Sequence, residues 1–205
     1  MVSREFPHPA DGLAGLLLDG RDEYRAFFPL WRETLQAGFL RPADAYRHLS
    51  WADLRGIQNQ YLIYALRKEN LPLDDPSSYL GFVSYWIAPP GGDGRVVATT
   101  GMYFKPPARG RGWFRPFFLA TLERLRGGIP IRGVKRRERT RSTRPLEMSG
   151  VVRVHRVRGV TSSANSVMRH LFETAGFRLA SVEPGALPFN GSPGDALTYL
   201  LELDG

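Results

Sequence analysis

A strand-like segment, a glycine-rich turn and an amphipathic helix follow one another near the middle of this chain. Residues 95–105 are rich in β-branched and aromatic side chains, and residues 113–126 carry apolar side chains at helical spacing. The turn between them, residues 106–112, reads PPARGRG. A helix start leaves backbone N–H groups unpaired, and glycines remove the Cβ atoms that would keep an anion away. This order therefore predicts an α/β fold with a phosphate cradle at the turn.

Basic side chains surround the turn. Arg109, Arg111 and Arg115 add positive charge that suits a diphosphate better than a single carboxylate. Two nucleotide-binding fingerprints are excluded, because no Gly-Lys-Ser/Thr follows and the glycines do not continue as G-x-G-x-x-G. A plain tight turn is the alternative interpretation of two glycines before a helix.

Patterning elsewhere in the chain predicts a mixture of helices and strands. A cluster of Pro and Gly at 89–94 separates two strand-like segments, which predicts a hairpin. Ser50 and Asp53 resemble a capping box at a helix start, and residues 161–163 offer hydroxyls that cap a later helix. We expect strands at 61–67, 79–88, 95–105, 129–134, 151–160, 177–183 and 195–203, and helices at 22–36, 113–126 and 164–175.

The length and composition indicate one compact domain. A chain of 205 residues and 23.0 kDa is long enough for a substantial core, so we expect a single domain over residues 1–205. The absence of cysteine excludes disulfides and thiolate metal sites, and four scattered histidines do not indicate a metal. No apolar run approaches the ~20 residues of a membrane span, and residues 1–10 lack a signal peptide's apolar stretch. We therefore expect a soluble, cytoplasmic protein with no membrane partner.

Positive charge is concentrated in one stretch of the chain. Residues 105–158 hold 16 Lys and Arg against three acidic residues, a balance of +13, whereas the rest of the chain has a balance of −5. Within this stretch, residues 127–150 show neither helical nor strand periodicity, which predicts a basic insertion loop. Its basic residues are Arg132, Lys135, Arg136, Arg137, Arg139, Arg141 and Arg144.

Three interpretations of the basic insertion stay open. It binds an anionic partner such as a nucleic acid, it docks an acidic acyl-carrier protein, or it forms a solvated loop without a partner. The segment contains no aromatic residue, which disfavours a base-stacking platform within it.

Two segments in the same order along the chain resemble motifs of the GNAT superfamily of acyl-CoA N-acetyltransferases. Residues 102–119 read MYFKPPARGRGWFRPFFL, and residues 161–177 read TSSANSVMRHLFETAGF. Arg109 and Gly112 match the first two fixed positions of the family's Arg/Gln-x-x-Gly-x-Gly/Ala turn, and Phe114 stands where the family usually has glycine or alanine.

The resemblance implies a GNAT-like fold, in which a mixed, mostly antiparallel central sheet is flanked by helices. Residues 1–60 would form variable substrate-side helices, and residues 127–150 would be an insertion in the single domain. Acetyl-CoA would be the donor, and the acceptor would be a primary amine that attacks the thioester directly, without a covalent enzyme intermediate.

The resemblance also assigns residues to coenzyme A. Asn165, which opens the helix of the second motif, would approach the pantetheine arm, and main-chain amides near Tyr103 and Phe104 would polarise the thioester carbonyl. The full set of expected cofactor-binding residues is Met102, Tyr103, Phe104, Arg109, Gly110, Arg111, Gly112, Trp113, Phe114, Arg115 and Asn165.

The resemblance also bears on the catalytic acid and base. Family members often carry a tyrosine seven residues after the asparagine, where this chain has Phe172. Tyr103, or a hydroxyl among Ser162, Ser163 and Ser166, is a candidate acid. His155 is the candidate base, since histidine exchanges protons near neutral pH, although a structural role is the alternative and a base acting through water, or none, stays open.

Two other functions remain open at this point. The basic stretch suits a nucleic-acid-binding or nucleic-acid-modifying protein on the same fold. The aromatic residues Phe114 and Phe172 at two family positions suit a non-catalytic domain that binds coenzyme A or a partner.

Overall fold

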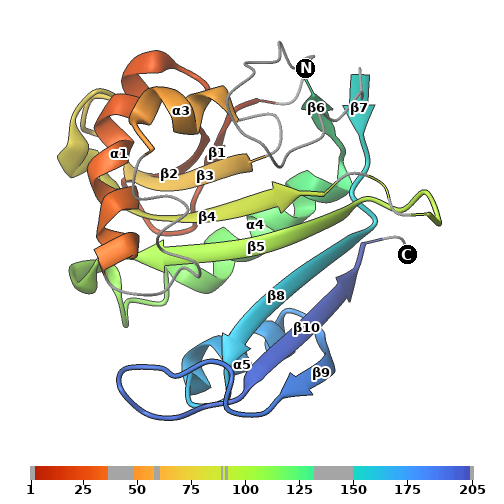
Figure 1. Ribbon diagram of the computed structural model, residues 1–205. Helices are drawn as coiled ribbons and strands as arrows, with labels where there is room; N and C mark the ends of the chain where they lie inside the picture. The colour runs from red at the N-terminus through yellow and green to blue at the C-terminus, as the bar shows by residue number, and fades with distance from the viewer. Residues whose placement is uncertain are drawn as a thin grey trace. The chain divides into compact units, whose positions relative to one another are not determined.

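The computed structural model of this chain describes residues 3–36, 49–57, 61–88, 90, 92–131 and 150–203 (Figure 1). The chain divides into two compact units: unit 1 comprises residues 1–85 and 102–121, and unit 2 comprises residues 86–101 and 122–205. Among the helices of the described segments, none is long and apolar enough to cross a bilayer.

The sheet of unit 1 has its strands in the order β1-β2-β3-β4-β5 (Figure 1). β1 pairs with β2, and β2 with β3, in antiparallel register. β4 and β5 form the predicted hairpin and continue into unit 2. The bounds are β1 Glu5–Pro7, β2 Leu13–Leu17, β3 Tyr61–Lys68, β4 Tyr79–Ile87 and β5 Val97–Phe104.

Helices cover both faces of this sheet. α1 (Arg21–Gln36) and α3 (Trp51–Gly56) pack on one face around a buried cluster that includes Trp31 and Ile63. Side chains alternate along a strand, so Tyr64 lies on the other face, where its ring meets Phe6 edge-on. The first turns of α4 (Phe114–Arg126) contribute Phe117 to that second face, stacked on Phe6 at 6.0 Å between ring centroids.

The helices expected over residues 1–60 are only part of that segment, which also contains two strands. β1 and β2 precede α1 and form the edge of the unit 1 sheet. Both strands are short, and an apolar run as short as that of β2 does not distinguish a strand from a helix by its period. The expected helix at 22–36 is confirmed despite Pro29, and the Ser50–Asp53 capping box is present as predicted.

The sheet of unit 2 has the order β5-β8-β10-β9 and contains the parallel pair β5 and β8. The β8/β10 and β10/β9 pairs are antiparallel, so the expected mixed, mostly antiparallel sheet is confirmed. α5 packs on β8, where the ring of Phe172 fills the space that a Cβ on Gly159 would need. The bounds are β8 Arg156–Ser162, β9 Arg178–Glu183, β10 Ala196–Glu202 and α5 Ser166–Thr174.

Two local expectations in unit 2 need correction. The single strand expected at 151–160 is two strands, β7 (Gly150–Val152) and β8, which belong to different sheets. The cap of α5 is Asn165, whose side-chain oxygen accepts from the backbone N–H of Met168 at 3.1 Å, and not the preceding hydroxyls. Asparagine caps a helix start as well as serine does.

The two ends of the basic insertion pair with each other. β6 (Ile129–Ile131) and β7 form a separate antiparallel ribbon, with register from Ile129↔Val152 to Ile131↔Gly150. The seven basic residues from Arg132 to Arg144 lie outside the described residues, so their predicted anionic partner remains a prediction.

Gly81 tests the packing of unit 1. A Cβ on Gly81 would lie 2.6 Å from the ring of Phe104, which is buried against Phe114 and Phe117. We predict that Gly81→Ala lowers the free energy of unfolding by about 1–3 kcal/mol, measured by urea denaturation, because the ring must move. Gly56→Ala is the matched control, since nothing lies within 4 Å of its Cβ position. Equal unfolding midpoints for the two variants would contradict the packing described.

Candidate functional site: an anion-binding loop

The loop between β5 and α4 has a backbone that requires glycine at two positions. β5 ends at Phe104, a 3₁₀ turn follows at Pro106–Ala108, and α4 begins at Phe114. Gly110 and Gly112 have φ of +70° and +74°, a region that side chains disfavour. Nothing lies within 4 Å of a Cβ built on either glycine. The glycines are therefore needed for backbone conformation, and the space beside them is open.

Four consecutive main-chain N–H groups of this loop have no protein partner among the described residues: those of Gly112, Trp113, Phe114 and Arg115. In the preceding 3₁₀ turn, the bonds run from Ala108 N to the Lys105 carbonyl and from Arg109 N to the Pro106 carbonyl. The first helical bond of α4 runs from Phe117 N to the Trp113 carbonyl at 3.4 Å. Unpaired N–H groups at a helix start, with the partial positive charge of the helix, form a binding site for an anion.

The Phe114 ring does not obstruct this loop. It is half-buried and packs against Phe104 and Phe118, with ring centroids 4.7 and 6.1 Å apart. The space beside Gly110 and Gly112 stays open. The departure from the small residue usual in the GNAT motif is therefore accommodated by aromatic packing inside unit 1.

The three arginines of the loop lie on an acid-free stretch, since residues 102–121 contain no Asp or Glu. Arg109 Nε donates to the Phe104 carbonyl at 2.9 Å, and Arg111 Nε donates to the Pro107 carbonyl at 2.9 Å. Arg115 is exposed and has no side-chain partner in the described part of the chain. All three guanidinium groups are exposed and keep donors for phosphate oxygens.

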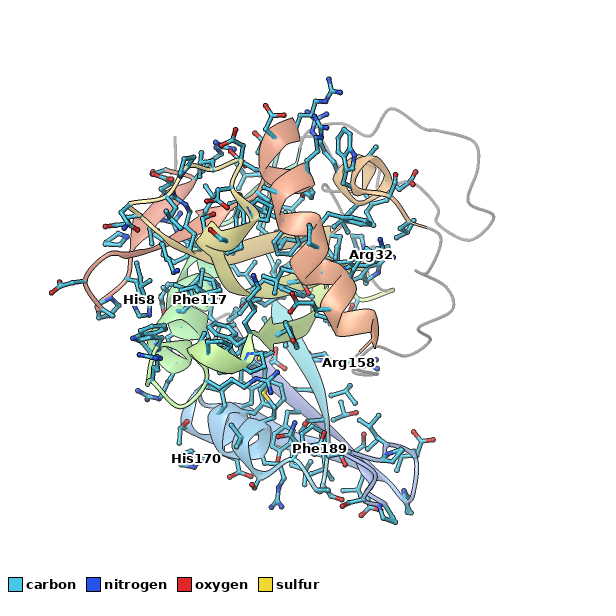
Figure 2. All side chains as sticks on the ribbon, turned by 90° about the vertical axis from the view of Figure 1, so that its left-hand side faces the viewer. His8, Arg32, Phe117, Arg158, His170 and Phe189 are labelled. Carbon is cyan, nitrogen blue, oxygen red and sulfur yellow. The ribbon has the colours of Figure 1, made fainter. Side chains whose placement is uncertain are left out.

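His8, the residue after β1, makes a hydrogen bond to the loop that the sequence did not indicate. Its Nδ1 accepts from Ala10 N at 3.0 Å, so its Nε2 carries the proton and donates to the Trp113 carbonyl at 2.8 Å. Figure 2 labels His8 beside Phe117, in the first turns of α4. His8 and Trp113 are 105 positions apart in the chain, and no local pattern signals such a contact.

We predict that His8→Ala loosens the loop while the fold is kept. The lost hydrogen bond contributes about 1 kcal/mol, which is enough to speed local opening severalfold. Amide hydrogen exchange of Phe117, whose N–H donates to the same Trp113 carbonyl, should accelerate, and His170→Ala, which changes an exposed histidine, should leave it unchanged. Exchange at wild-type rates in His8→Ala would contradict the clamping role.

Tyr103 lies at the end of β5 between a cation and an anion. The Arg109 guanidinium lies 5.5 Å from its ring centroid, and its hydroxyl donates to Glu33 Oε2 on α1 at 3.4 Å. Burial raises the pKa of Tyr103, the Glu33 charge raises it further, and Arg109 opposes the shift. The phenol is therefore neutral at physiological pH, so it is able to donate a proton or hydrogen bond and is not a base.

The residues of β5 that the resemblance assigns to coenzyme A are Met102, Tyr103 and Phe104, which form the end of the strand. The parallel register of β5 with β8 ends at Thr100↔Gly159, whereas β5 continues through Met102 and Tyr103 to Phe104. The assignment of these residues to coenzyme A remains a prediction.

The predicted base, His155, and Phe172, which stands where family members often carry a tyrosine, belong to unit 2 and have structural contacts there. His155 Nδ1 accepts from Val96 N at 3.0 Å, next to the first paired residues of β5 and β8. Phe172 is buried against Phe177 and Tyr199 and carries no hydroxyl. His155 as a base therefore stays a prediction with a structural alternative in view.

The remaining candidates of unit 2 also make local bonds. Ser162 Oγ accepts from Ala164 N at 3.3 Å, and Ser163 Oγ accepts from Asp195 N at 2.8 Å. Asn165 uses its side-chain oxygen as the α5 cap, which leaves its NH₂ group as the part that could meet a pantetheine arm.

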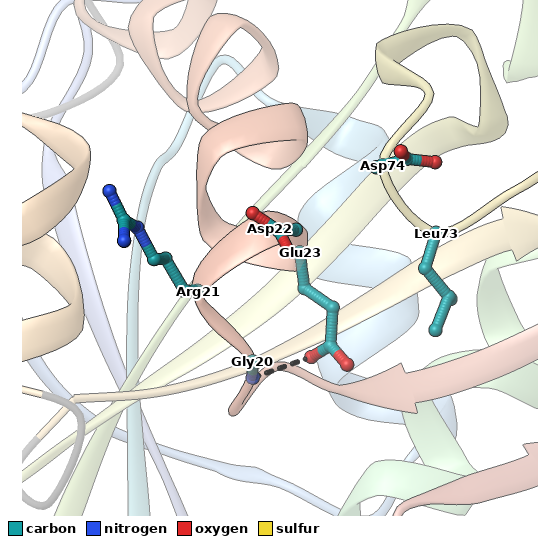
Figure 3. A pocket seen from close by; sticks show the side chains of 6 residues that line it. All are labelled: Gly20, Arg21, Asp22, Glu23, Leu73 and Asp74. Atoms are coloured by element: carbon teal, nitrogen blue, oxygen red, sulfur yellow. Dashed lines mark hydrogen bonds between the residues drawn. The ribbon is translucent and has the colours of Figure 1, made fainter.

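A hollow at the start of α1 is not a second anion site. It is lined by Gly20, Arg21, Asp22, Glu23, Leu73 and Asp74 (Figure 3). The Glu23 carboxylate accepts from the N–H groups of Asp19 and Gly20 and from Arg4. The Glu23 carboxylate thus already lies at the helix start, and the acidic walls repel a phosphate.

Solved acetyltransferases have the same fold. A GCN5-related N-acetyltransferase from Kribbella flavida is similar at 15% identity and a TM-score of 0.63, over 94% of this chain and 98% of that one. A ribosomal-protein-S5-alanine acetyltransferase from Vibrio fischeri is similar at 14% identity and a TM-score of 0.64, over 98% of this chain and 97% of that one. A spermidine N-acetyltransferase from Vibrio cholerae, in complex with CoA and spermine, is similar at 15% identity and a TM-score of 0.59, over 95% of this chain and 97% of that one.

These likenesses establish the fold of the chain as that of the GNAT acetyltransferases, as the two sequence motifs predicted. No family model matches the sequence, and no curated protein matches it.

Proposed function

We propose that this protein is an N-acyltransferase that transfers an acetyl or other acyl group from acyl-CoA to a primary amine. The observation that carries the proposal is the run of four N–H groups from Gly112 to Arg115 that no described residue accepts from, beside two left-handed glycines with open space. On a GNAT fold, this combination supports binding of the coenzyme A diphosphate.

Main-chain and side-chain groups of the loop have different roles in binding the donor. The main-chain N–H groups would hold the diphosphate, and Arg109, Arg111 and Arg115 would supply the countercharge. Acyl-CoA supplies an activated thioester when it is bound. The neutral Tyr103 phenol, one residue before Phe104, is the candidate that protonates the leaving sulfur.

Calorimetric titration with coenzyme A tests the first step. We predict saturable binding to the wild-type chain and an affinity at least about tenfold lower in Gly112→Glu, because an anion then stands beside the diphosphate. Gly94→Glu is the matched control: Gly94 has φ of +73° and nothing within 4 Å of its Cβ position, so it adds the same charge and similar backbone strain elsewhere.

The outcomes separate the proposal from its rivals. No binding to wild type at millimolar coenzyme A would remove the acyltransferase assignment, and equal affinities for the two glutamate variants would remove this loop as the site. Thiol release from acetyl-CoA upon addition of primary amines then distinguishes an enzyme from a domain that only binds the cofactor.

A further inference from the structure

Glu33 is a half-buried carboxylate that has no cation beside it in the described part of the chain. It lies on α1, and its one side-chain hydrogen bond there is the 3.4 Å contact with the Tyr103 hydroxyl. No Lys, Arg or His nitrogen of the described residues lies within 4.0 Å of its oxygens. Its neighbour Arg32, labelled in Figure 2, is exposed, and adjacent helix residues do not face each other.

Two other carboxylates of the fold are paired with arginines. Glu23 accepts two N–H groups from Arg4, and Glu202 accepts from Arg156 at 2.6 Å. A carboxylate that is partly removed from water loses hydration, and a cation or several hydrogen bonds must replace it. Among the described residues Glu33 has a single long bond, to a neutral hydroxyl, so none of them neutralises its charge against a ligand cation.

Glu33 also lies next to the proposed donor loop. Tyr103 contacts Glu33 through its hydroxyl, and Arg109 lies over the ring of the same tyrosine. Arg109 is fixed at the loop by the Phe104 carbonyl and makes no ion pair with Glu33. One aromatic side chain therefore separates a cation that suits the donor's phosphates from an anion that suits a positively charged group.

We propose that Glu33 binds a cationic nitrogen of the acceptor other than the reacting amine, so that the protein selects acceptors whose second group is positively charged over those whose second group is neutral or acidic. This inference rests on the proposed acyltransferase function and names its acceptor class. An ammonium group carries a full positive charge and three hydrogen-bond donors, so a carboxylate binds it more strongly than it binds a hydroxyl. An acceptor carboxylate would be repelled at the same place.

Direct binding measurements test the inference. The probes are 1,4-diaminobutane, 4-amino-1-butanol and 4-aminobutyrate, which have similar length and differ in the charge of one end. When binding is measured by changes in amide chemical shifts, the wild-type chain should bind the diamine most tightly and the amino acid least. Glu33→Gln should weaken diamine binding about tenfold or more and remove most of the preference, with coenzyme A affinity unchanged. Asp22→Asn, at an exposed carboxylate of the same helix, should change neither.

A second variant separates the carboxylate from its partner. Tyr103→Phe retains Glu33 and should retain the diamine preference, so loss of the preference there would overturn the assignment. An unchanged preference in folded Glu33→Gln would also overturn it, while leaving the proposed function standing. If coenzyme A fails to bind the wild-type chain, the proposed function fails, and the diamine titration still decides the role of Glu33.

Discussion

Main-chain N–H groups at the start of α4 require partners that the described protein atoms do not supply. Water can satisfy them at modest cost, but a diphosphate also gains from the partial positive charge of the helix and from three nearby arginines. The two left-handed glycines make the loop conformation accessible and leave its outer side open. The chemistry proposed for the protein depends on this unsatisfied backbone more than on any single side chain.

Aromatic packing holds this backbone in place. The Phe104 ring is buried against Phe114 and Phe117, and its carbonyl accepts from Arg109. The half-buried Phe114 ring thus packs against the core, although the related motif usually has a small residue there. His8 adds a hydrogen bond to the Trp113 carbonyl. The hydrophobic core of unit 1 therefore fixes the geometry of the loop from which α4 begins.

Local features of the fold were predictable and long-range ones were not. The strand, glycine turn and helix from β5 to α4 follow from consecutive residues, as does the Ser50 cap, because the period and the turn residues specify them. β1 and β2 were missed because they are too short to show a period. His8 and Glu33 were missed because their partners lie 105 and 70 residues away, and charge and hydropathy patterns contain no such pairing.

The account is tested most directly by the backbone amide resonances of residues 112–115 during a titration with coenzyme A, compared with pantetheine, which has no phosphate. It predicts that coenzyme A shifts these four resonances more than others in the chain and that pantetheine leaves them nearly unchanged. Coenzyme A binding that leaves the four amides unperturbed, or equal shifts with pantetheine, would contradict a diphosphate held by the start of α4.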